Sequence, residues 1–123
     1  MYDKFLAEEL LQRIETSLKE IIDWTVCIKS VNDFLLSTDG VILLNAVCMK
    51  LFAIGEEVKS LDKCTNKALL LKYPMIQWKD IMGMRDVIAH HYFDLEAEKV
   101  FDTLKEEVPE LFNVIIKMRQ DLL

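Results

Sequence analysis

The chain has 123 residues, a formal charge of −6 and a sequence pI of about 4.9. This length fits one domain of ordinary size, which we expect to span residues 1–123. Hydrophobic residues make up 52% of the chain, and the three Gly and two Pro supply too little turn chemistry for many strands. The acidic balance argues against a broad basic surface for nucleic-acid backbones, so we expect no DNA partner.

Two further features of the composition bear on the cellular location. Cys27, Cys48 and Cys64 are odd in number and form no C-x-x-C pair. We therefore expect three buried reduced thiols, no disulfide and no zinc site. The amino-terminal residues are charged and amphipathic, and no apolar run exceeds four residues, too few to span a bilayer. These features predict a cytoplasmic protein with no membrane partner.

In the first half of the chain, apolar spacing predicts two long helices. Residues 4–28 carry apolar side chains at steps of three and four, with Asp3 as the N-cap. A short helical turn over residues 31–36 follows. Thr38 or Asp39 then opens a second long helix from about residue 40 to residue 59.

The second half is also predicted to be helical. We expect a polar connection over residues 61–65, one or two helical turns over 66–73, and a helix that begins near Ile76. A last helical segment covers residues 95–122, and Pro109 should kink or restart it because proline lacks a backbone N–H. The predicted fold is all-α, an antiparallel helical bundle of about five helices.

The predicted helix over residues 40–59 is apolar around most of its circumference. Such a helix is normally buried on all sides, and a domain this small can hardly cover every face. We therefore favour a homodimer that forms through this helix. The alternative is a central helix wrapped by the rest of its own chain.

The most informative stretch is residues 85–92, which places an Arg, a His and a Tyr close together in an apolar helical segment. Arg85 and Tyr92 are seven residues apart and share a helical face, whereas His90 is five residues beyond Arg85 and does not. Asp86 and His90 are four residues apart and can meet. Arg85 and His90 converge either where the helix ends or loosens around His90, or across a two-fold axis between subunits.

The residue types in this stretch suit phosphodiester cleavage without a metal. His90 can take the proton of a ribose 2′-hydroxyl or give one to the leaving 5′-oxygen. Arg85 can stabilise the charge on the phosphorane, and Asp86 can fix the tautomer of His90 or raise its pKa. His90 and His91 diverge by about 100° on a helix, so we expect no metal site and no cofactor.

Four segments of the chain resemble the HepT-like proteins of the HEPN superfamily. Residues 83–93 are similar to the family signature of Arg, a polar residue, three residues, His, one residue and Tyr. The other three segments resemble family landmarks in the same order: residues 54–58 (I-G-E-E-V), 73–81 (Y-P-M-I-Q-W-K-D-I) and 106–111 (E-E-V-P-E-L).

The resemblance implies a dimeric helical bundle that acts as a metal-independent endoribonuclease toxin on an RNA substrate. A minimal nucleotidyltransferase (MNT) antitoxin would be its partner. By resemblance, Arg85 and His90 are catalytic, and Tyr92 is the hydroxyl that the antitoxin modifies with AMP. Position 86 departs from the family's common Asn and adds a negative charge. The alternative is a noncatalytic nucleotide- or substrate-binding subunit of a nucleotidyltransferase complex.

Overall fold

The computed structural model describes residues 2–90 and 97–123, apart from the side chains at positions 85, 89 and 90. These residues form helices and connecting turns with no strand, so the all-α prediction is confirmed for them. In chain order the elements are α1 (Lys4–Trp24), α2 (Asn32–Leu35), α3 (Thr38–Cys64), the 3₁₀ helix η1 (Leu70–Lys72), α4 (Trp78–His90), α5 (Ala97–Asp102), the π-helical turn η3 (Thr103–Glu107) and α6 (Val108–Leu122).

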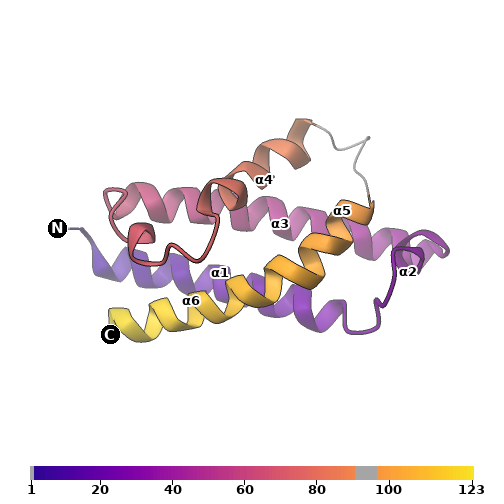
Figure 1. The fold of residues 1–123 in the computed structure, drawn as a ribbon, viewed down its shortest axis with the longest axis horizontal. Helices are drawn as coiled ribbons and strands as arrows, with labels where there is room; N and C mark the ends of the chain where they lie inside the picture. The colour runs from indigo at the N-terminus through magenta and orange to yellow at the C-terminus, as the bar shows by residue number, and fades with distance from the viewer. Residues whose placement is uncertain (1, 91–96) are drawn as a thin grey trace.

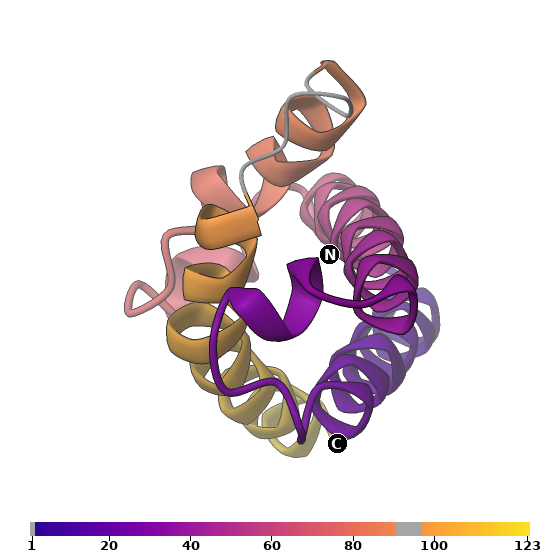
Figure 2. The same ribbon diagram turned by 90° about the vertical axis from the view of Figure 1, so that its right-hand side faces the viewer.

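Three helices, α1, α3 and α6, run along the long axis of the molecule, with α1 antiparallel to the other two (Figure 1). Figure 2 shows α2 lying across one end of the bundle. The carboxylate of Asp3 accepts the backbone N–H of Leu6 at 3.1 Å, which confirms the predicted N-cap of α1. The helix ends at Trp24, four residues earlier than predicted, where the buried hydroxyl of Thr25 donates to the carbonyl of Ile21 at 2.7 Å.

The second long helix, α3, is longer than its apolar pattern indicates. Its N-cap is Ser37, whose side chain accepts a backbone N–H at 2.9 Å, rather than either of the two residues that follow it. The predicted polar connection over residues 61–65 is wrong, because Leu61 is fully buried and the helix continues through Cys64. The chain turns where Asn66 and Lys67 adopt positive φ angles of 56° and 61°.

The close approach of α2 to the start of α3 requires a glycine at position 40. A Cβ at this position would lie 2.8 Å from the carbonyl oxygen of Phe34 and closer still to that of Asp33. We expect Gly40→Ala to lower the free energy of unfolding by about 1–3 kcal/mol, because the backbone of α2 must move away. Gly83→Ala is the matched control, since a Cβ there meets no described atom within 4 Å. Urea unfolding measures both variants, and equal stabilities would contradict this packing.

The predicted restart of the helix near Pro109 is confirmed, since the helix type changes there. The backbone N–H of Val108 bonds to the carbonyl of Thr103, five residues earlier, and closes the π-helical turn η3. Pro109 then lies in the first turn of α6, where its missing N–H leaves a gap in the hydrogen bonds that would continue the helix from η3. The segment predicted as one interrupted helix is therefore α5, η3 and α6.

The three thiols differ in exposure, so the prediction that all three are buried is wrong in part. Cys48 lies in the core, and burial raises the pKa of its thiol. Cys64 is partly buried, whereas Cys27 is exposed because α1 has already ended when the chain reaches it. None of the described helices is both long enough and apolar enough to cross a bilayer.

Polar contacts fasten α6 to the rest of the bundle. The guanidinium of Arg119 donates to Glu8 at 2.8 Å and lies 3.2 Å from Glu15, which ties α6 to α1. The hydroxyl of Tyr73 donates to the carboxylate of Asp121 at 2.7 Å and ties the segment after η1 to the end of α6. These contacts hold together the end of the molecule where both termini lie.

The Tyr73–Asp121 bond predicts a pH dependence of stability. Burial and the neighbouring Asp121 carboxylate raise the pKa of Tyr73 to about 12, above its ordinary value of 10.0. The protonated phenol is therefore favoured in the folded state, and its contribution to stability should be lost as the pH rises from about 10 to about 12. We expect the stability difference between the natural chain and Tyr73→Phe to shrink over this interval in urea unfolding. A difference independent of pH would contradict the assignment.

Candidate functional site

Helix α4 carries both residues predicted to be catalytic. It begins at Trp78, whose indole N–H donates to the carbonyl of Tyr73 at 2.8 Å and fixes the start of the helix. Ile81 and Ile88 are buried, and the helix packs mainly against α3. Figures 1 and 2 show that the far end of α4, which carries His90, points away from the rest of the bundle.

The backbone of α4 places positions 85 and 90 on different sides of the helix. Position 85 falls between Ile81 and Ile88 along the buried side, seven residues after Trp78. Position 90 lies about 140° around the axis from position 85, because an α-helix turns about 100° per residue. The two positions do not share a face of one α4.

The sequence left open two ways in which Arg85 and His90 could converge: a helix that ends or loosens around His90, or a contact between two subunits. The structure bears on both. Helix α4 is α-helical through His90, so the backbone does not loosen between Arg85 and that residue. Asp86 is exposed and lies four residues before His90, at the spacing predicted for a contact. Tyr92 lies outside the described residues. With a regular helix, convergence of Arg85 and His90 needs either a helix end after position 90 or a second subunit.

Exposed apolar side chains lie on the helices beside this site. On α3, Ile42 is 62% exposed and Met49 is 64% exposed, and their seven-residue spacing puts them on one face. On α4, Val87 is 54% exposed and lies three residues before His90 on the outer side of the helix. An apolar face of this kind is typical of a surface that another macromolecule covers.

Outside α4, two kinds of feature among the described residues could carry chemistry: metal-ligating clusters and pockets. No group of three or more His, Cys, Asp and Glu side chains among them is arranged to hold a metal ion. A pocket that the sequence did not predict lies at the other end of the bundle, near both termini, and is lined by Tyr2, Lys72 and Tyr73 among others. Its residues come from segments far apart in the sequence, so no local motif marks it.

Comparisons with known proteins found relatives that are named as ribonucleases. A Methanocaldococcus jannaschii protein named "Putative RNase MJ0127" is 31% identical over 112 residues, which cover 91% of this chain and 86% of the relative. "Putative RNase MJ0125" from the same organism is 39% identical over 77 residues, 63% of each chain. "Probable ribonuclease HepT" from Thermococcus cleftensis is 31% identical over 75 residues, 61% of this chain and 64% of the relative.

The extent of the matches differs between these proteins. The alignments with MJ0125 and with the Thermococcus protein span less than two thirds of each relative's own length. No solved structure matches the chain significantly. The sequence profile described as "Ribonuclease HepT-like" matches residues 14–118, from the middle of α1 to the last turns of α6 and including all of α4. The chain belongs to the HepT-like ribonuclease family.

Proposed function

We propose that this chain is a metal-independent endoribonuclease, the toxin of a toxin–antitoxin pair, and that Arg85 and His90 form its catalytic site. The observation that carries the proposal is the family match over residues 14–118, which includes the helix bearing both residues. The formal charge of −6 leaves no general attraction for RNA, so a local cation at the site must hold the phosphate. Arg85 supplies such a cation on α4 itself.

The proposed reaction is a transfer of the phosphate to the adjacent ribose hydroxyl. His90 takes the proton of the 2′-hydroxyl or delivers one to the 5′-oxygen that leaves, and water accepts or supplies the other proton. The 2′-oxygen forms a bond to phosphorus as the bond to the 5′-oxygen breaks, which yields a 2′,3′-cyclic phosphate and a 5′-hydroxyl end. Arg85 stabilises the negative charge that develops on the phosphorane oxygens. Asp86 is a positioning residue that orients His90.

Two subunits would complete this site. The exposed apolar face of α3 gives a second copy a surface to cover, and Val87 continues the apolar character onto α4. In a two-fold symmetric contact both copies use the same patch. The α4 helices of the two copies would therefore lie near each other. His90 of one subunit would then approach Arg85 of the other, which a single regular α4 does not permit.

The proposed control of the activity is modification of Tyr92 by an MNT antitoxin. Addition of AMP to the Tyr92 hydroxyl would place bulk and negative charge two residues beyond His90 and repel the RNA phosphate. Co-expression with a nucleotidyltransferase encoded beside this chain tests the pairing. Intact-mass analysis should show one added AMP group per chain, and Tyr92→Phe should abolish that addition. An unmodified Tyr92 after co-expression would contradict this control.

The experiment that tests the proposed function uses the purified natural chain and a mixed RNA substrate in excess EDTA. Cleavage that continues in EDTA supports the proposal, because His90 and Arg85 need no metal for their roles. Cleavage that appears only with added Mg²⁺ or Mn²⁺ would contradict it. Nucleotide binding that Arg85→Ala weakens, without any cleavage, would support the noncatalytic alternative, which the added charge of Asp86 beside an anionic substrate favours.

A further inference from the structure

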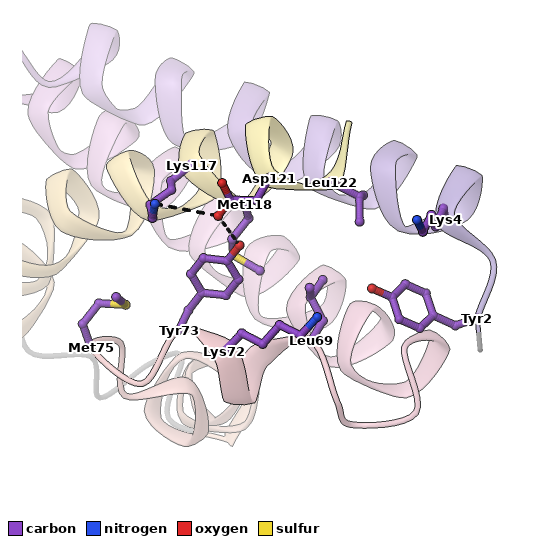
Figure 3. Close-up of a pocket in the computed structure, with 10 residues that line it drawn as sticks. All are labelled: Tyr2, Lys4, Leu69, Lys72, Tyr73, Met75, Lys117, Met118, Asp121 and Leu122. Carbon is purple, nitrogen blue, oxygen red and sulfur yellow. Dashed lines mark hydrogen bonds and ion pairs between the residues drawn. The ribbon is translucent and has the colours of Figure 1, made fainter.

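A second candidate site lies at the end of the bundle where both termini meet, away from the far end of α4. It is a pocket of about 380 Å³ between the start of α1, the segment around η1 and the end of α6 (Figure 3). This volume falls within the range of small-ligand sites in proteins. The pocket is therefore large enough for a ligand, and its lining shows which chemistry the ligand must have.

The lining is positively charged although the chain as a whole is acidic. Lys4, Lys72 and Lys117 come from three different segments, and Asp121 is the only acidic residue among the residues that line the pocket. Lys117 lies 3.8 Å from Asp121. Among the described residues, no carboxylate lies within ion-pairing distance of Lys4 or Lys72. Two ammonium groups are thus available to an anion.

Two phenols and an apolar floor complete the lining. Tyr73 is only 5% exposed, and its hydroxyl is held by Asp121. Figure 3 shows the hydroxyl of Tyr2 and the ammonium of Lys72 directed into the same space. The buried side chains of Leu69 and Met118 also line the pocket and supply apolar surface. The pocket combines a cationic rim with aromatic and apolar surfaces.

We propose that this pocket binds a nucleoside monophosphate. A phosphate monoester carries a charge of about −1.5 to −2 at neutral pH, which matches two unpaired ammonium groups. Lysine binds phosphate as a point charge, and the partly exposed ring of Tyr2 offers a face on which a base can stack. The ligand is a free nucleotide or the 5′-terminal nucleotide of an RNA, because both carry the same phosphate and base.

The test is a titration of the natural chain with AMP, adenosine and inorganic phosphate, followed by the amide signals in nuclear magnetic resonance spectra. We expect AMP to shift the signals of residues 69–73 and 117–122, and to bind at least about tenfold more tightly than adenosine or phosphate. Such a preference would show that both the phosphate charge and the base contribute to the binding of AMP. AMP that binds no more tightly than either of them, or that leaves these signals unmoved, would overturn the proposal.

Substitutions in the pocket and on α4 show where AMP binds and whether this binding is independent of the candidate catalytic site. Lys4→Ala with Lys72→Ala should weaken AMP binding at least about tenfold, because two charge-assisted contacts are lost. The matched control replaces the exposed Lys59 and Lys79, which lie outside the pocket, and should leave AMP binding unchanged. Binding unaffected by the Lys4 and Lys72 changes would overturn the proposal. His90→Ala should retain AMP binding here, so failure of the catalytic proposal is distinguishable from failure of this one.

A 5′-phosphorylated RNA trinucleotide identifies the source of the ligand. Competition between this RNA and AMP for the signals of residues 69–73 would show that the pocket takes the 5′ end of an RNA. A trinucleotide that does not compete would restrict the pocket to free nucleotides. Either result supports binding of a nucleoside monophosphate, provided that AMP itself binds as described.

Discussion

His90→Ala is expected to lower the rate of RNA cleavage by about 10²–10⁴-fold while leaving the fold intact. Removal of a general acid–base group costs a factor of this size, because water must take over the proton transfer. Position 90 is the last residue of α4 and lies on the side of the helix away from the buried stripe. Its truncation should therefore cost little stability. Single-turnover cleavage in EDTA measures the rate, and thermal unfolding checks the fold.

Two companion variants define the specificity of this effect. Arg85→Ala should lower the cleavage rate by about 10²–10³-fold, as loss of one electrostatic donor to a developing anion does. His91→Ala is the matched control, since it removes an imidazole next to His90 and should leave the rate nearly unchanged. A His90→Ala variant that cleaves RNA as fast as the natural chain would contradict the assignment of His90. So would a His91→Ala variant that loses as much cleavage rate as His90→Ala.

Ile42→Asp combined with Met49→Asp is expected to dissociate the proposed dimer and to abolish cleavage. Both side chains lie on the exposed face of α3, so the changes should not disturb the core. A two-fold contact repeats each substitution, so four carboxylates would be buried or brought together in one interface. We expect dimer affinity to fall by a factor on the order of 10² or more. Sedimentation and RNA cleavage measure the two effects.

Phe5→Asp is the matched control for this surface. Phe5 is 82% exposed, but it lies on α1 near the terminus rather than on the face of α3. This variant should keep both the proposed dimer and the proposed cleavage activity. A double variant at Ile42 and Met49 that still sediments as the natural chain does would contradict the proposed interface. So would a monomer that cleaves RNA at the natural rate.

Subunit mixing tests whether each site uses residues of both subunits. Arg85→Ala and His90→Ala chains are each expected to be inactive, and a mixed dimer would contain one site with both residues intact. Activity should therefore return when the two chains are unfolded and refolded together. Mixtures that stay inactive would contradict a site shared between subunits, although His90→Ala alone would still report on catalysis.

Local features of this chain were predictable because they depend on neighbouring residues. Asp3 caps α1 through a hydrogen bond to a backbone N–H three residues away. The change of helix type before Pro109 follows from a missing donor in the same helix. The placement of Arg85 and His90 on one helix likewise follows from the spacing of apolar residues around them. Each of these predictions needs only one segment of sequence.

Features that depend on tertiary contacts were not predictable in the same way. The polar composition of residues 61–65 predicts a loop, yet burial of Leu61 against the rest of the bundle keeps that segment helical. Cys27 has apolar neighbours but is exposed, because α1 ends earlier than its pattern indicates. The pocket at the termini brings Lys4 and Lys117 together from opposite ends of the chain. Only the assembled fold shows these relations.

The ends of the cleaved RNA report directly on whether His90 acts without a metal. Acid–base catalysis by His90 without a metal predicts 5′-hydroxyl ends and 2′,3′-cyclic phosphate or 3′-phosphate ends in EDTA, because the 2′-oxygen is the nucleophile. End-labelling of the products with and without prior phosphatase treatment distinguishes these ends from the alternatives. We expect the natural chain to give 5′-hydroxyl ends and His90→Ala to give almost none. Products with 5′-phosphate and 3′-hydroxyl ends, formed only when a divalent metal is present, would contradict it.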